Sequence, residues 1–130
     1  MKPPCEVVVK EVLPAIRATM VLELTGRHHL SQTEVAQRLG ITQPAVSQYL
    51  RMLRGARRKN PVLQKLEKQA RELAGDIASG KLEHAQLIEG YCSICRTMSK
   101  QQLLCLLHFK TAPYLRAEGC RACLPRDGSG

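Results

Sequence analysis

Residues Gln32–Leu53 read QTEVAQRLGITQPAVSQYLRML. Within this stretch Ala36 is the small residue that lets two short helices cross closely. Gly40, four positions later, can adopt the left-handed conformation that a tight turn between them needs. Apolar side chains that lock two such helices together stand at Val35, Leu39, Ile41, Val46 and Leu50. The stretch therefore predicts a helix-turn-helix, and a helical hairpin with a purely structural role is the alternative.

Local signals mark the ends of both helices. Ser31 followed by Glu34 forms an S-x-x-E capping box, which predicts a helix start at Ser31. Thr42 is expected to cap the second helix, with Pro44 in its first turn, where a missing N–H does no harm. Gly55 is expected to end that helix. Its buried side is predicted to consist of Val46, Tyr49, Leu50 and Leu53.

The segment before this motif also has helical periodicity. Its apolar residues follow steps of three and four, at Val9, Leu13, Ile16, Met20 and Leu24. They predict a helix over residues 6–25 with one buried face. Pro14 interrupts the pattern, so the helix is expected to kink there or to start afresh at the proline.

Three further helices are predicted after the motif. The first has apolar residues at Leu63, Leu66, Ala70, Leu73 and Ile77. This spacing fits a seam with a partner helix or an amphipathic helix packed on its own domain. A short helix is expected over residues 82–89, ended by Gly90. The last is expected over residues 99–110, with a stripe formed by Leu103, Leu104, Leu106 and Leu107.

The positive charge of the chain is unevenly distributed. The 130 residues carry 20 Lys and Arg against 11 Asp and Glu, a formal net charge of +9. Residues 1–60 have a net charge of +6, residues 61–90 of −1 and residues 91–130 of +4. The excess peaks at Arg51, Arg54, Arg57, Arg58 and Lys59. This excess of positive charge indicates a polyanionic partner, with nucleic acid as the first candidate and an acidic membrane surface as the second. The alternative is charge that only keeps the chain soluble.

Length and apolar runs exclude several classes of protein. A chain of 130 residues has room for one domain, or one small domain with an appendage, and is too short for a barrel or a large doubly wound enzyme fold. No run approaches the roughly 18 apolar residues of a membrane span. The first residues form no apolar signal core closed by a small-residue cleavage site. These features predict a cytoplasmic protein that does not enter membranes.

Four motifs carry a resemblance to a known family. They are Pro4-Cys5-Glu6, Leu13-Pro14-Ala15-Ile16-Arg17, the core from Ser31 to Leu50, and the C-x-x-C of Cys92 and Cys95. The core resembles the phage-repressor, or XRE-like, helix-turn-helix. The wider pattern, over residues 3–95, is similar to archaeal predicted transcriptional regulators with a cysteine-rich C-terminal segment.

This resemblance implies that Gln43, Ser47 and Gln48 face base edges of DNA. The N-terminal end of a recognition helix points into the major groove, where Gln pairs with adenine. Residues at helix N-termini and arginines suit phosphates. The predicted phosphate contacts are Gln32, Thr42, Arg51, Arg54, Arg57 and Arg58. Arg38 is either a further phosphate contact or a simply exposed side chain.

The six cysteines suggest a metal site. Two C-x-x-C pairs, Cys92/Cys95 and Cys120/Cys123, are 24 residues apart, close to the spacing of a Zn(Cys)4 site. Iron–sulfur clusters also take four thiolates from mixed spacings. The predicted ligands are Cys92, Cys95, Cys105, Cys120 and Cys123, with His108 and Cys5 as further candidates. Disulfides, or a purely apolar role for Cys105 in its leucine-rich helix, are the alternatives.

Together these patterns predict a mainly α protein. A helix-turn-helix bundle of four to five helices is expected in residues 1–60, linker or dimerisation helices in residues 61–90, and a small cysteine-rich helical segment in residues 91–130. The predicted function is a dimeric, cytoplasmic transcriptional regulator that binds specific double-stranded DNA and carries an iron–sulfur cluster or zinc that senses redox or metal state. The alternative is a zinc-stabilised nucleic-acid-binding or transcription-adaptor module without sensing. The sequence shows no nucleophile–base–acid grouping and no Gly-rich phosphate loop, so we do not expect an enzyme.

Overall fold

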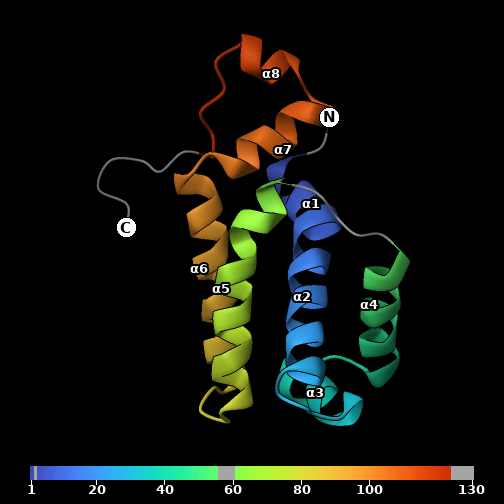
Figure 1. Cartoon of the computed structure of the whole chain (residues 1–130). Coiled ribbons are helices and arrows are strands. Elements are labelled where there is room, and N and C mark those ends of the chain that lie inside the picture. The colour runs from blue at the N-terminus through green and yellow to red at the C-terminus, as the bar shows by residue number, and fades with distance from the viewer. Residues whose placement is uncertain (2, 56–60, 124–130) are drawn as a thin grey trace.

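The computed structural model describes residues 1, 3–55 and 61–123, with residues 53–55 and 61–63 described by their backbone alone. Across these ranges the chain forms helices and no strand, which confirms the mainly α prediction. Helix α2 (Leu13–Gly26) lies at the centre of the bundle, between α4 on one side and α5 on the other (Figure 1). No helix in the described ranges combines the length and hydropathy needed to cross a membrane.

The N-terminal helix changes its winding just before Pro14. It consists of α1 (Pro4–Val7), a π-helical turn (η1, Val8–Val12) and α2. Proline has no N–H to donate and its ring meets the carbonyl four residues back, so a regular ladder cannot run through it. The π turn accommodates the hydrogen bond that proline cannot make. A new α-helix, α2, begins after it, as predicted.

The π turn also shifts which side chains face the core. Val7 and Val12, five residues apart, are both buried, whereas Val9 is 61% exposed. The prediction that Val9 lies on the buried face is therefore wrong. A π turn bonds residue i to i+5, so the α-helical spacing counted from Pro14 does not hold upstream of it. Downstream, Ile16 and Met20 are buried as predicted.

The helix-turn-helix forms from the predicted capping residues. Helix α3 spans Gln32–Leu39, and α4 spans Gln43–Gly55. Ser31 Oγ accepts a hydrogen bond from the Glu34 amide at 3.1 Å, and Thr42 Oγ1 accepts one from the Ala45 amide at 3.2 Å. Gly40 ends α3 with a φ of +67°, in the left-handed region that favours glycine.

The apolar residues of the motif pack as expected. Val35, Ala36, Leu39 and Val46 are buried in the core of the bundle. Ile41, Tyr49 and Leu50 are partly buried against the same core. The side chain of Leu53, also predicted to be buried, lies outside the described residues.

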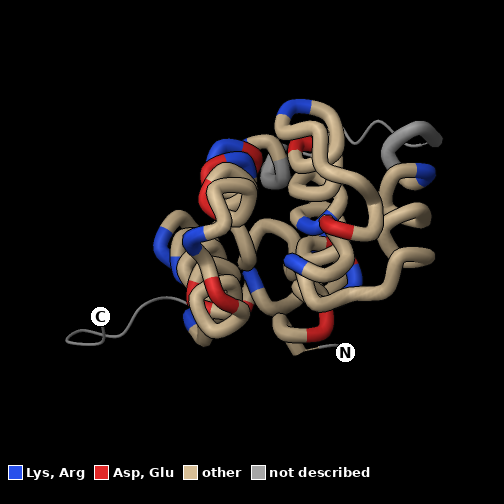
Figure 2. Tube along the Cα trace, turned by 90° about the horizontal axis from the view of Figure 1, so that it is seen from below, with Lys and Arg blue, Asp and Glu red and all other residues tan. Residues whose placement is uncertain are grey.

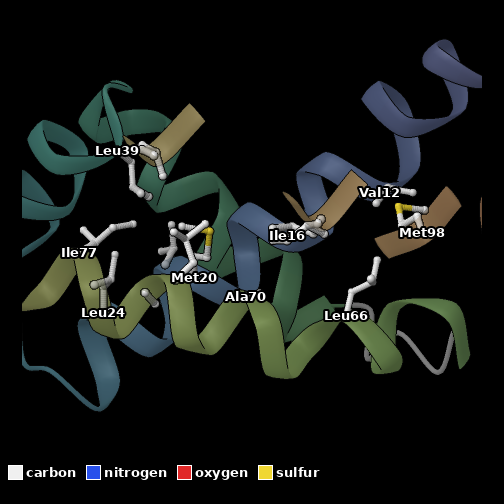
Figure 3. Packing of buried hydrophobic residues seen from close by; sticks show 14 of the residues in the cluster. Val12, Ile16, Met20, Leu24, Leu39, Leu66, Ala70, Ile77 and Met98 are labelled. Atoms are coloured by element: carbon white, nitrogen blue, oxygen red, sulfur yellow. The ribbon is translucent and has the colours of Figure 1, made fainter. Parts of the chain in front are cut away.

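Helix α5 (Pro61–Ala78) packs within its own chain. Its buried side chains are Leu66, Ala70, Leu73 and Ile77. Figure 3 shows Leu66, Ala70 and Ile77 alongside Ile16, Met20 and Leu24 of α2. Of the two interpretations of this spacing, the structure shows the amphipathic helix packed on its own domain. The side chain of Leu63 lies outside the described residues.

Helix α6 (His84–Lys100) continues through Gly90, so the prediction of a short helix that stops there is wrong. Gly90 lies where α6 meets α5, and a Cβ added to it would stand 2.6 Å from Leu73 Cδ1. The glycine therefore permits a close approach of two helices instead of ending one. At the other end of α6, Glu83 and Gln86 form a capping box.

The last helices cover one end of the bundle. Helix α7 spans Leu103–Thr111 and α8 spans Tyr114–Ala117. The predicted helix over residues 99–110 starts too early, because Gln102 adopts a φ of +58° and separates α6 from α7. Gln carries no sequence signal for this conformation. In the predicted stripe Leu103, Leu104 and Leu107 are buried, but Leu106 is 45% exposed.

Candidate nucleic-acid interface and thiol cluster

The first residues of α3 and α4 are joined by their side chains. Gln43 Nε2 donates a hydrogen bond to Gln32 Oε1 at 2.9 Å. This bond holds the Gln43 amide in place and leaves its Oε1 and its second N–H for another partner. One acceptor and one donor in this arrangement are complementary to N6 and N7 of adenine.

The outer face of α4 carries the predicted base-reading residues. Gln43 and Gln48 are exposed, and Ser47 is half-buried. Gln43, Ser47 and Arg51 follow one another at steps of four and so lie along one line of the helix. Val46 faces the core instead. The arrangement presents amide and hydroxyl groups near the start of the helix and a cation two turns later.

Three of the predicted phosphate contacts belong to the described residues. Thr42 and Arg51 are exposed, and Gln32 is half-buried. Helix α4 carries no acidic residue, and in Figure 2 no red segment falls on it. The side chain of Arg54, together with Arg57 and Arg58, lies outside the described residues. In the described part, the helix surface is free of carboxylates that would repel phosphates.

Arg38 has a structural role that the sequence did not reveal. Its Nη1 donates to the carbonyl oxygens of Ile77 at 2.8 Å and Ala78 at 3.0 Å, at the C-terminal end of α5. A cation at this end stabilises the unpaired carbonyls and the negative end of the helix dipole. The side chain is half-buried and is therefore not simply exposed, whereas the alternative of a phosphate contact stays a prediction.

The six cysteines, all free thiols, come from several segments of the chain. Cys5 lies in α1, Cys92 and Cys95 in α6, Cys105 in α7, and Cys120 and Cys123 follow α8. Helix α7 packs against both α1 and α6, at the end of the bundle where the N-terminus lies (Figure 1). Contacts between distant segments thus bring together the parts of the chain that carry cysteines.

The thiols influence one another across these segments. Burial raises the pKa of Cys123 to about 11, with further contributions from Cys105, Cys120 and Cys5, and Cys123 is hydrogen-bonded with Cys105. Burial also raises the pKa of Cys95, followed by the effects of Cys92 and Cys5. Cys5 therefore lies within electrostatic reach of one thiol from each C-x-x-C pair. Its distance in sequence gave no indication of this position.

The chemistry of the cysteine side chains favours a metal site, but their positions in the structure do not. Thiolates are suitable ligands for zinc and for iron–sulfur clusters. Within residues 1, 3–55 and 61–123, however, no three His, Cys, Asp or Glu side chains are grouped closely enough to hold a metal ion. His108, the other candidate ligand, is buried on α7 one turn after Cys105. Ligation would require the thiols to move closer together.

Comparison with known proteins identifies the motif. Residues 24–77 match a family model described as Helix-turn-helix. The matched segment begins in the last turn of α2, contains α3 and α4, and ends in the last turn of α5. No curated protein and no solved structure matches the chain. The match covers the side-chain pair and the outer face of α4 described above.

Proposed function

We propose that this protein is a sequence-specific regulator of transcription that binds double-stranded DNA through α3 and α4. The observation that carries the proposal is the Gln43–Gln32 hydrogen bond at the start of α4, within a segment that matches a helix-turn-helix model. In such motifs the N-terminal end of the second helix enters the major groove. A pre-oriented amide at that place is suited to read a base edge.

The exposed face of α4 suggests a division of roles. Gln43, Ser47 and Gln48 read base edges, with Gln43 placed to pair with adenine through two hydrogen bonds. Thr42 and Gln32, at helix N-termini, contact phosphates, where backbone N–H groups add positive potential. Arg51 is the phosphate contact of the later turn of α4, and Arg54, Arg57 and Arg58 are expected to extend it. These phosphate contacts supply affinity and fix the register, but do not distinguish sequences.

Selection of bound duplexes from a random pool tests this proposal. We expect enrichment of a near-palindrome, with half-sites about 34 Å apart if two copies bind. Gln43→Ala should then weaken binding by about 1–3 kcal/mol and relax the base preference at one position of each half-site. Gln64→Ala, at an exposed glutamine of α5, is the matched control and should change neither. Failure to enrich any sequence would refute the proposal.

We further propose that the cysteine-rich segment, residues 91–130, binds an iron–sulfur cluster or zinc, and that its state alters operator affinity. Support comes from the free thiols and from the position of Cys5, which adds a sixth thiol to Cys92, Cys95, Cys105, Cys120 and Cys123. When bound, the metal would link α1, α6 and α7. The alternative is a zinc-stabilised nucleic-acid-binding or adaptor module without sensing.

Purification without oxygen, followed by an absorption spectrum and metal analysis, separates these possibilities. A brown protein with bound iron supports a cluster, because iron–sulfur clusters are held by cysteine thiolates. A colourless protein with zinc fits both a zinc-dependent sensor and the zinc-stabilised alternative, which the operator affinity of the metal-free protein then distinguishes. Absence of both metals refutes the metal proposal. Operator affinity that does not change on metal removal or oxidation refutes sensing, whichever metal is found.

A further inference from the structure

Arg17 connects three helices in the middle of the bundle. It belongs to α2, and its guanidinium carbon lies 5.7 Å from the centroid of the Tyr91 ring on α6. It is also hydrogen-bonded with the phenols of Tyr49, on α4, and Tyr91. Burial lowers the pKa of Arg17, but the hydrogen bonds and the electrostatic effects of the two tyrosines together more than offset it, so the pKa is raised. The side chain stays cationic and touches both the DNA-reading helix and the helix with the first C-x-x-C.

A cation is an unusual choice for packing at this place. The Nε of Arg17 is buried and has no hydrogen-bond partner among the described residues. Both tyrosines pack partly buried against the hydrophobic core, while the Arg17 side chain is half-buried and keeps part of its contact with water. An arginine at this place can stack on one tyrosine ring and donate hydrogen bonds to both phenols.

The two ends of this contact lie beside functional candidates. Tyr49 directly follows Gln48 in α4, and Tyr91 directly precedes Cys92 in α6. Tyr49 lies on the inner side of α4 with Val46 and Leu50, so its contacts contribute to how the helix is rotated about its own axis. A rotation of α4 re-aims Ser47 and Gln48, and recognition tolerates deviations of only about 10–20°.

We propose that Arg17 is a positioning residue for DNA recognition, which fixes the rotation of α4 through Tyr49 and ties it to α6 through Tyr91. This inference rests on the proposed function, since it specifies what orients the base-reading side chains. It also identifies the route by which a change at Cys92 and Cys95 would reach α4. Arg17 itself contacts no DNA.

The substitution Arg17→Met tests the proposal, because Met fills similar space without charge or donors. We expect affinity for the selected operator to fall about tenfold, a value between those of an exposed and of a desolvated cation–π contact, because Arg17 is half-buried. Affinity for an unrelated duplex and the dependence of binding on salt should stay unchanged, because no phosphate contact is lost. The control is Arg71→Met, which removes ion pairs to Glu23 and Glu67 on α2 and α5 and should alter none of these values.

A second measurement does not depend on DNA. In the free protein, Arg17→Met should speed amide hydrogen exchange in α4, and Arg71→Met should not. In a double-mutant cycle, Tyr49→Phe should add little to the effect of Arg17→Met, because both remove the same contact. Unchanged exchange in α4, or equal losses of affinity for the operator and the unrelated duplex, would overturn the inference. If no operator exists but α4 exchange responds as expected, the proposed function fails, and what remains is that Arg17 holds α4 in place.

Discussion

Gln43 and Arg38 are both polar residues of the helix-turn-helix, but their surroundings separate their roles. Gln43 makes one hydrogen bond to Gln32 and leaves the rest of its amide exposed. Arg38 directs its guanidinium at two backbone carbonyls of α5. At the residue scale, the available donors and acceptors indicate which side chain can meet a partner. Residue type alone would have favoured the arginine.

Cys123 should be the slowest thiol to react in the reduced, metal-free protein. The thiolate is the nucleophile, and a pKa of about 11 leaves almost none of it at pH 8. Alkylation with iodoacetamide, followed by mass spectrometry, should therefore modify the exposed Cys92 well before Cys123. The rate at Cys123 should rise with pH until about 11. Equal rates at the two thiols at pH 8 would contradict this prediction.

At the scale of elements, the contacts between helices give the glycines different structural roles. Gly40 ends α3 because it adopts a left-handed conformation, whereas Gly90 lies within α6 and has no such requirement. Gly90 is close to Leu73 across the α5–α6 contact, while a Cβ on Gly75 in α5 would meet nothing within 4 Å. Substitutions at the two interior glycines therefore separate the effect of helix packing on stability from the effect of helix propensity.

Alanine at these two interior positions should have opposite consequences. Gly75→Ala is expected to raise the free energy of unfolding by up to about 1 kcal/mol, because alanine favours the helix. Gly90→Ala gains the same propensity but forces Leu73 to move, and should be less stable than Gly75→Ala by about 1–3 kcal/mol. Urea unfolding measures both values. Equal effects would show that α6 does not depend on this close approach.

At the scale of the whole molecule, α2 holds the two halves of the bundle together. It contacts α3 and α4 on one side and α5 on the other, and α6 packs against α5 (Figure 1). The buried residues form one continuous cluster from α1 to α7. A change at the cysteine-bearing end therefore has a packed route to the DNA-reading helices. The face of α5 that could have met a partner chain is covered by α2.

Leu66→Ala should destabilise the single chain. Leu66 is 1% exposed in the α2–α5 interface, so we expect a loss of about 2–5 kcal/mol in the free energy of unfolding. Leu22→Ala, at a leucine that is 52% exposed on α2, should change it by less than about 0.5 kcal/mol. If Leu66→Ala instead weakened self-association and left the stability of the monomer intact, the packing of α5 on α2 would be wrong.

Two copies of the chain should occupy one operator. A near-palindrome places two half-sites about one helical turn apart, and a symmetric pair of proteins matches them. Sedimentation of the complex should give two chains per full duplex and one chain, bound more weakly, per half-site duplex. A single chain bound with full affinity to the complete operator would contradict the dimer predicted from the sequence.

Local sequence determined the helix-turn-helix. Ser31, Gly40 and Thr42 act on backbone groups within three or four residues, and the spacing of apolar residues selects the buried face of each helix. Such signals need no knowledge of the rest of the chain, so the start of α4 and its exposed face could be predicted. The cysteine spacing suggested a metal site, which stays a prediction, and gave no indication of where the thiols lie relative to one another.

Tertiary structure decided the features that depend on contacts between distant segments. The exposure of Val9 follows from the π turn before Pro14, and the passage of α6 through Gly90 follows from its contact with Leu73. Cys5 joins the other thiols because α1 packs against α7, and Arg17 meets Tyr49 and Tyr91 because α2 lies between their helices. The pairing of helices that places these groups together is not encoded within one helix length of sequence.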